Sequence, residues 1–169
     1  MDKAHSLIQI RGATISDAAA IASVLYESFV EFEPLYTVEG FAATTPNHYQ
    51  VGRRMSEGPT WVALLADTIV GTVSAVIEGE DLYVRSMAIL PGARGHGIGR
   101  LLLEQVEHFA RENRCRRLFL STTPFLHRAI HLYEHFGFAR GEEEPHDLFG
   151  TPLFTMSKHL ARETADAVN

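Results

Sequence analysis

An α+β fold is predicted for this chain of 169 residues. Three observations favour it: stretches with apolar residues at helical spacing, shorter stretches rich in β-branched residues, and turn residues between them. A run of three strands stands between helices instead of alternating with them one by one. This mixed order is typical of an α/β sandwich, in which helices cover a central sheet. The length fits one domain, so we expect residues 1–169 to form a single domain.

The first third of the chain predicts a strand, a helix, an irregular segment and a short helix. Residues 7–11 alternate apolar and polar side chains, as a half-buried strand does. Thr14 and Asp17 have capping-box spacing, and apolar residues then recur at helical spacing, which predicts a helix to about residue 30. Residues 31–46 contain a proline, a glycine and several aromatic residues, so we expect a loop or a broken helix there. Residues 47–56 predict the short helix.

The middle of the chain predicts three consecutive strands. Residues 61–66 and 69–77 are apolar and rich in β-branched side chains, with a short polar turn between them, which indicates a hairpin. Residues 82–90 predict the third strand, and Pro91 and Gly92 end it.

The last part of the chain predicts two helices, each followed by a strand. Residues 98–111 place apolar side chains on one helical face and charged side chains on the other. A strand follows at 118–122, and a second helix at 126–136 ends at Gly137, a natural helix stop. Residues 153–156 predict the final strand.

Charge and composition exclude several classes of function. The net charge of −6 argues against a nucleic-acid partner, since such proteins normally present a basic face. No apolar run is as long as a membrane span, and residues 1–10 lack the apolar core of a signal peptide, so we expect no membrane partner and a cytoplasmic location. Cys115 is the one cysteine, which excludes an internal disulfide, and we expect an inert thiol.

The strongest chemical signal is a glycine-rich turn between a strand and a helix. Gly95, Gly97 and Gly99 lack Cβ atoms, so a ligand can approach the backbone closely. The free N–H groups and the positive dipole end of the following helix favour an anion there. Arg94 and Arg100 flank the turn and suit a phosphate further. The turn therefore predicts a phosphate-binding site.

Three known phosphate-binding patterns compete for this turn. A P-loop needs Lys-Ser or Lys-Thr after its last glycine, but Ile98 and Gly99 follow here. A dinucleotide-binding turn would need a third glycine where Arg100 stands, and it would belong to an opening βαβ unit. The pattern Arg/Gln-x-x-Gly-x-Gly/Ala is matched throughout by Arg94, Gly97 and Gly99.

Two segments resemble the GNAT superfamily of N-acetyltransferases. The run Met-Ala-Ile-Leu-Pro-Gly-Ala-Arg-Gly-His-Gly-Ile-Gly-Arg-Leu-Leu at 87–102 is similar to its cofactor-binding signature. The run Ala-Ile-His-Leu-Tyr-Glu-His-Phe-Gly-Phe at 129–138 is similar to its "A-x-x-L-Y-E-x-x-G-F" helix. The resemblance covers about residues 8–158. It implies a central, twisted mixed sheet flanked by helices, which opens after the strand at 82–90.

The resemblance also implies acetyl-CoA as co-substrate, with no metal. The pantetheine arm would pair with the backbone of the strand that ends in the glycine turn, and the pyrophosphate would sit on the amides of the turn. The implied cofactor-binding residues are Met87, Ala88, Ile89, Arg94, Gly95, His96, Gly97, Ile98, Gly99 and Arg100. Leu126 stands where relatives often have an asparagine that touches the pantetheine arm, so Thr122 or Thr123 would make that contact.

Acyl transfer to an amine needs a proton donor for the leaving thiolate and an acceptor for the amine proton. Tyr133 is the candidate donor, because it lies on the inward helix face and the family places its thiolate-facing tyrosine there. The acceptor stays open. Some relatives have a glutamate on the strand before the turn, but that position holds Tyr83. The other candidates are a water chain and the carboxylates Glu31, Glu33, Glu78, Glu80 and Asp81.

The acceptor side is less defined by the sequence. Arg85 binds a substrate carboxylate if it points inward and is a surface residue if it does not. His127, His131 and His135 have the spacing of a metal site, but a solvated helix face is the preferred interpretation. The aromatic residues Phe29, Phe32, Tyr36, Phe41 and Trp61 are either core or the wall of an acceptor pocket.

We therefore expect an N-acetyltransferase that acetylates a primary amine of a small molecule by direct attack. The alternatives are a protein lysine or N-terminal acetyltransferase and a non-catalytic acyl-CoA-binding module. A homodimer is compatible with the sequence.

Overall fold

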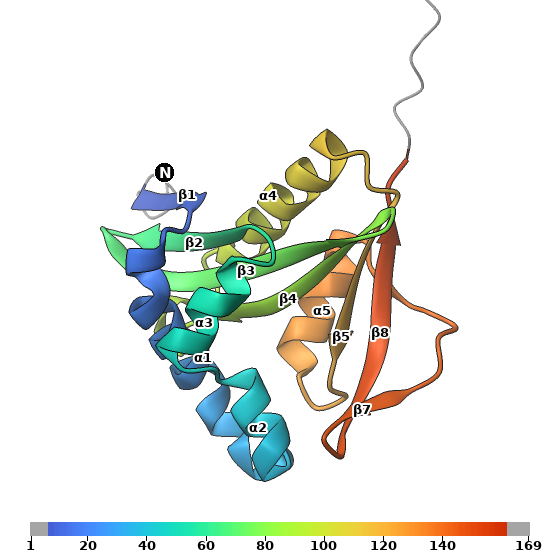
Figure 1. Ribbon diagram of the computed structural model, residues 1–169, viewed down its shortest axis with the longest axis horizontal. Helices are drawn as coiled ribbons and strands as arrows, with labels where there is room; N and C mark the ends of the chain where they lie inside the picture. The colour runs from blue at the N-terminus through green and yellow to red at the C-terminus, as the bar shows by residue number, and fades with distance from the viewer. Residues whose placement is uncertain (1–6, 162–169) are drawn as a thin grey trace, which may run out of the picture.

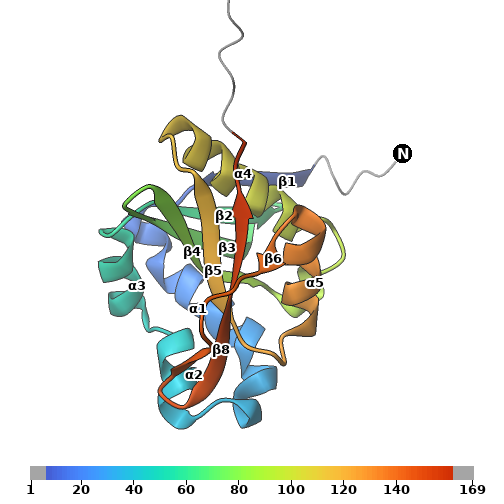
Figure 2. The ribbon, with the colours of Figure 1, turned by 90° about the vertical axis from the view of Figure 1, so that its right-hand side faces the viewer.

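The computed structural model describes residues 7–161. Figures 1 and 2 show a sheet with helices packed on both of its faces. In chain order the elements are β1 (Ile8–Gly12), η2 (Ile15–Asp17), α1 (Ala18–Phe29), η3 (Val30–Leu35), α2 (Val38–Thr44), α3 (His48–Met55), β2 (Thr60–Leu65), β3 (Thr68–Glu78), β4 (Asp81–Ile89), η4 (Pro91–Ala93), α4 (Ile98–Glu112), β5 (Arg117–Thr122), α5 (His127–Phe136), β6 (Ala139–Arg140), β7 (His146–Leu148) and β8 (Thr151–His159). The predicted α+β class is confirmed.

The sheet is mixed, as expected. Its strand order is β1-β2-β3-β4-β5-β8-β6, and β7 pairs with β8. Only β4 and β5 run parallel, while the other described pairs are antiparallel. A parallel pair needs a long crossover connection, and α4 supplies it.

The sheet opens between β4 and β5. These strands pair at only three positions, from Asp81 with Arg117 to Tyr83 with Phe119. Beyond that point β4 continues beside β3, and β5 continues beside β8, so the two strands diverge (Figure 1). The opening was expected after residues 82–90 but begins inside that strand. Beyond Tyr83, the edge of β4 that faces β5 therefore has free backbone donors and acceptors, and this free edge leads to the glycine turn.

A β-bulge redirects the side chains of β4 at the opening. Thr72 pairs with Ala88 but Ser74 pairs with Arg85, so β4 holds one extra residue. Ser86 lies in the bulge with a φ of 54°. Leu82 and Val84 belong to the apolar cluster beneath α4, whereas Ala88, after the bulge, belongs to the cluster beneath α1.

The core consists of two apolar clusters, one on each face of the sheet. Predicted apolar residues of α4 (Ile98, Leu102 and Val106) are fully buried in the first cluster, which also holds Trp61 against Phe109, with 5.5 Å between ring centroids. The second cluster lies beneath α1 and α3. Trp61 is therefore a core residue.

Residues 31–46 form a broken helix, one of the two expected alternatives, since η3 and α2 lie there, and Thr37 starts α2 by accepting a hydrogen bond from Gly40 N at 3.0 Å. The end of the chain differs from the prediction. The final strand β8 extends well beyond residues 153–156, and the short strands β6 and β7 beside it were not predicted. These C-terminal strands depend on pairing with residues distant in the chain, since β8 pairs along β5.

The segment that contains α2 is fixed to the hairpin of β7 and β8. Thr37 N donates to Thr151 Oγ1 at 2.9 Å, and Thr37 Oγ1 donates to Phe149 O at 2.8 Å. A Cβ on Gly40 would lie 2.4 Å from Thr151 Oγ1, so the close approach requires glycine there. Figures 1 and 2 both show α2 beside the β7–β8 turn, below the sheet opening.

No helix among residues 7–161 combines the length and apolarity needed to cross a bilayer.

Candidate active site

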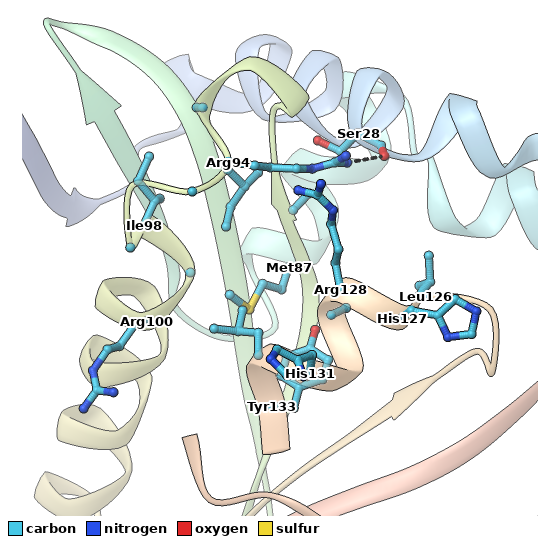
Figure 3. A pocket seen from close by; sticks show the side chains of 18 of the residues that line it. Ser28, Met87, Arg94, Ile98, Arg100, Leu126, His127, Arg128, His131 and Tyr133 are labelled. Atoms are coloured by element: carbon cyan, nitrogen blue, oxygen red, sulfur yellow. Dashed lines mark hydrogen bonds between the residues drawn. The ribbon is translucent and has the colours of Figure 1, made fainter. Parts of the chain in front are cut away.

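A cavity of about 740 Å³ lies at the sheet opening, and its walls come from four parts of the chain (Figure 3). The lining residues are Ser28, Phe29 and Phe32 from α1 and η3, Met87, Ala88 and Ile89 from β4, Ala93, Arg94, Gly95, Gly97, Ile98, Gly99 and Arg100 from the glycine turn and α4, and Leu126, His127, Arg128, Ala129, His131, Leu132, Tyr133 and His135 from α5 and the residue before it. Apolar groups form most of the wall, and the polar side chains come from α1, the glycine turn, the start of α4, and α5.

The start of α4 presents free backbone donors to this cavity. Gly97 precedes the helix with a φ of 75°, and no side chain among the described residues caps this helix start. Gly95 has a φ of 85°. These left-handed conformations favour glycine, and they aim the first-turn N–H groups at the cavity, at the positive end of a helix dipole. The arrangement is suited to an anion.

Gly99 has a different physical role from the one expected. A Cβ there would lie 2.6 Å from Leu132 Cδ2 and 3.1 Å from Ile89 Cδ1. The space that glycine leaves is filled by neighbouring side chains, so Gly99 permits α4 to pack against α5 and β4. The glycine pattern thus combines a backbone requirement with a packing requirement.

The two arginines that flank the turn lie differently. Arg94 Nη1 is 2.7 Å from Glu31 Oε1, and Arg94 Nη2 donates to Ser28 O at 3.3 Å, which holds the guanidinium at the cavity. Arg128 of α5 lines the same cavity. Arg100 instead pairs with Glu104 at 3.1 Å and is largely exposed, and Figure 3 shows it directed away from Arg94.

Tyr133 lies on the buried face of α5 and lines the cavity with its hydroxyl directed inward (Figure 3). Only 8% of the residue is exposed. Burial, with a smaller contribution from nearby Tyr36, raises the pKa of the Tyr133 hydroxyl far above its usual value. The group is therefore protonated at neutral pH and can serve as a proton donor.

Comparison with known proteins identifies the chain. A family model described as the acetyltransferase (GNAT) family matches residues 22–138, more than half of the chain. The chain belongs to the acetyltransferase (GNAT) family. The expected enzyme class, an N-acetyltransferase, is thereby confirmed.

Individual relatives support the family. The N-acetyltransferase YjgM of Escherichia coli K12, described as uncharacterized, is 32% identical over 135 residues, which cover 76% of this chain and 80% of that protein. Streptothricin acetyltransferase of Streptomyces lavendulae is 36% identical over 87 residues, which cover 50% of this chain and 46% of that protein. The solved structure of YncA from Salmonella typhimurium with acetyl-CoA has a TM-score of 0.73 and 21% identity, and covers 96% of this chain and 99% of that one. This last likeness supports the GNAT fold.

Against this family background, the structure brings most of the expected cofactor residues to one cavity. Met87, Ala88, Ile89, Arg94, Gly95, Gly97, Ile98, Gly99, Arg100 and the candidate donor Tyr133 line it. His96 is exposed and does not line it. Thr123 is buried and does not line the cavity.

Sequence reasoning did not single out several residues of the cavity. No sequence motif points to Ser28 or Arg128, although the helical spacing of α5 places Arg128 beside His127. Tyr36 does not line the cavity, but it lies close to it. Burial raises the pKa of Tyr36 to about 12, partly offset by the hydroxyls of Thr123 and Thr44. Tyr36 and Thr123 are thus polar neighbours close to Tyr133.

The three histidines of α5 border the cavity. His127, His131 and His135 are exposed, as expected for a solvated face, yet all three line the cavity rim. His135 Nδ1 donates to His131 O at 2.9 Å, and the two rings lie 4.0 Å apart. Among the described residues no cluster of three metal-ligating side chains exists.

None of the candidate carboxylates lines the cavity within the described part of the chain. Glu31 is paired with Arg94, Glu80 with Arg116 and Asp81 with Arg117. Burial, with a smaller contribution from Asp81, raises the pKa of the Cys115 thiol, in keeping with an inert cysteine.

Proposed function

We propose that this enzyme transfers the acetyl group of acetyl-CoA to a primary amine of a small molecule by direct attack. One observation carries the proposal: a single cavity extends from the uncapped start of α4, along the free edge of β4, to the Tyr133 hydroxyl. An anion site, a strand edge and a proton donor thus follow one another along it. Coenzyme A presents the matching groups in the same order: pyrophosphate, amide-containing arm and thioester.

The residues present fit the co-substrate group by group. In this proposal the amides from Gly95 to Arg100 and the guanidinium of Arg94 hold the pyrophosphate. The free edge of β4 between Met87 and Ile89 pairs with the amides of the pantetheine arm. Thr123, one of the two expected contacts for this arm, is buried and does not line the cavity among the described residues.

The Tyr133 hydroxyl gives its proton to the leaving thiolate. The amine nitrogen bonds to the acetyl carbon, the carbon–sulfur bond breaks, and the sulfur receives the tyrosine proton. Because burial keeps this hydroxyl protonated, the donor form is available at neutral pH. Water takes up the amine proton and returns a proton to the tyrosinate of Tyr133, since no carboxylate among the described residues lines the cavity.

Two features favour a small acceptor over a protein. The segment around α2 is hydrogen-bonded to the β7–β8 hairpin through Thr37, Thr151 and Phe149, and it lies below the opening of the sheet (Figures 1 and 2). Phe29 and Phe32 add bulky apolar side chains to the cavity wall. A folded protein surface would need an open groove at this place.

Turnover on defined amines tests the proposal. The purified enzyme is incubated with acetyl-CoA and a panel of polyamines, amino acids and peptides, while free thiol is recorded and products are identified by mass spectrometry. Acetylated small amines are the expected products. Acetylation of peptides alone would replace the proposal with a protein acetyltransferase. Tight binding of acetyl-CoA without any turnover would indicate a binding module.

A further inference from the structure

Two arginine side chains lie together on the face of β4 opposite to α4. Arg54 comes from α3 and Arg85 from β4. Arg85 Nη2 is 3.4 Å from Arg54 O, and Arg54 Nη1 is 3.4 Å from the hydroxyl of Ser86, in the β4 bulge. Burial lowers the pKa of Arg54, and the positive charge of nearby Arg85 lowers it further. We refer to Arg54 and Arg85 as the arginine pair.

One carboxylate faces these two cations. Glu57 Oε2 lies 2.6 Å from Arg85 Nη2, yet the Glu57 side chain is 51% exposed whereas that of Arg85 is 20% exposed. Arg54 Nη2 donates to a neutral group, the carbonyl of Ala43, at 2.9 Å. Arg85 Nε is buried and has no hydrogen-bond partner among the described residues. The arginine pair therefore has more positive charge and more donors than the protein itself satisfies.

The exposed carboxylate also indicates the preferred ligand. Glu57 reaches Arg85 from a turn that follows α3, so its side chain can rotate into solvent without disturbing the core. A carboxylate from outside can then take the same place and use both guanidinium groups, which bind carboxylates through paired hydrogen bonds.

The arginine pair lies close to the reaction centre of the proposed function. Ser86 directly precedes Met87, which lines the cavity, and neighbouring residues of a strand are about 3.3 Å apart along its axis. Tyr83, two residues before Arg85, stacks on Phe119 at 5.1 Å, where β4 and β5 last pair. Because the co-substrate would occupy the side of the opening next to α4 and α5, an acceptor must approach from the other side. The arginine pair lies on that side.

We propose that the arginine pair binds a carboxylate of the acceptor, so that the acceptor is an amino acid or another amine that also carries a carboxylate. This inference rests on the proposed function and specifies its substrate class. The arginines orient the acceptor, while the amine reaches the thioester near Met87.

Matched acceptors test this assignment. Initial rates are measured for L-amino acids and for their carboxamides, which keep the amine and lose the negative charge. The enzyme should show a kcat/KM for the acids about ten- to a hundredfold above that for the amides, as expected for charge-assisted hydrogen bonds. Equal rates on acids and amides would overturn the assignment.

Variants connect this preference to the arginine pair. Arg85→Gln and Arg54→Gln should raise the KM for acids and reduce the acid-to-amide ratio to near one, with kcat for the amides and the KM for acetyl-CoA unchanged. Arg85→Lys should restore part of the ratio. Arg53→Gln, which removes an exposed arginine of the same helix, is the matched control. It should change neither the KM for acids nor the acid-to-amide ratio. Equal losses on acids and amides would indicate a purely structural role.

Glu57→Gln gives a result in the opposite direction. With its competitor removed, the arginine pair should bind acids more tightly, so their KM should fall several-fold while that of the amides stays constant. An unchanged or higher KM for the acids would contradict the idea that Glu57 occupies the carboxylate position.

A binding measurement separates the two proposals. N-acetyl amino acids and their amides are titrated by calorimetry into enzyme saturated with CoA. Tighter binding of the acids that disappears in Arg85→Gln supports the carboxylate site even if no acceptor turns over, and in that case only the proposed function fails. No preference for the acids in this titration, together with turnover of simple amines, would overturn the carboxylate site and keep the proposed function.

Discussion

Single residues of the glycine turn carry separate requirements. Gly97 is glycine because its φ is 75°, whereas Gly99 is glycine because Leu132 and Ile89 fill the space of a side chain. Gly92, with no atom within 4 Å of a Cβ built there, has neither requirement. At the same scale Tyr133 and Glu31 each lead to a distinct prediction.

Tyr133→Phe should lower kcat about a hundredfold or more, because it removes the proton donor for the thiolate. The dissociation constant of acetyl-CoA should stay within about twofold, since the ring still packs in the cavity wall. The raised pKa of the hydroxyl means that the donor form persists as pH rises, so kcat should not fall on the alkaline side up to about pH 10. Stopped-flow measurement of thiol release at a series of pH values gives kcat and its pH dependence, and calorimetry gives the dissociation constant of acetyl-CoA.

Tyr49→Phe, at an exposed tyrosine, is the control and should leave both kcat and the dissociation constant of acetyl-CoA unchanged. An unchanged kcat in Tyr133→Phe would remove Tyr133 from the mechanism.

Glu31→Gln should tighten the binding of CoA. Glu31 holds Arg94 at 2.7 Å in the place where a pyrophosphate would compete for it. A partly exposed ion pair contributes little, so the gain should be at most about fivefold. Calorimetry with CoA measures it, with Glu33→Gln, at an exposed neighbour, as control. If kcat falls instead while affinity is unchanged, Glu31 is the proton acceptor.

Whole elements were predictable where local pattern determines them. The apolar stripe of α4 and the glycine before it identified that helix, and the spacing of α5 placed Tyr133 on its inner face. The bounds of α2 within the expected loop or broken helix could not be predicted, because its N-cap Thr37 is itself fixed by Thr151, which is distant in the chain. Strands β6 and β7 are short, and they form only because β8 offers an edge.

The packing of α4 against α5 gives a prediction at this scale. Gly99→Ala should destabilise the fold by about 1–3 kcal/mol, since its Cβ would lie 2.6 Å from Leu132 Cδ2. Combining it with Leu132→Ala should recover part of that loss, which a double-mutant cycle of urea unfolding can measure. Gly92→Ala should be neutral. Strict additivity of Gly99→Ala and Leu132→Ala would mean that the two sites do not contact.

Over the whole molecule, the candidate site depends on contacts that no local pattern contains. Sequence motifs identified the donor side, because the glycine turn and the Tyr133 helix are short and contiguous. The arginine pair joins α3 to β4, and the Arg94–Glu31 contact joins the glycine turn to η3, so neither was visible as a pattern. The opening of the sheet likewise depends on strands that are distant in the chain. It forms because β4 continues along β3 while β5 continues along β8.

The hydrogen bond between Thr37 at the start of α2 and Thr151 of β8 should affect both the stability of the fold and the binding of the acceptor. Thr151→Val keeps the shape of this buried side chain but removes the oxygen that accepts from Thr37 N at 2.9 Å. Leaving that donor unpaired should cost about 1–3 kcal/mol of unfolding free energy. The α2 segment borders the acceptor side, so the KM of the acceptor should rise while that of acetyl-CoA stays constant. Thr68→Val, at an exposed position of β3, is the control. A loss of stability with both KM values unchanged would show that this hydrogen bond stabilises the fold but does not affect acceptor binding.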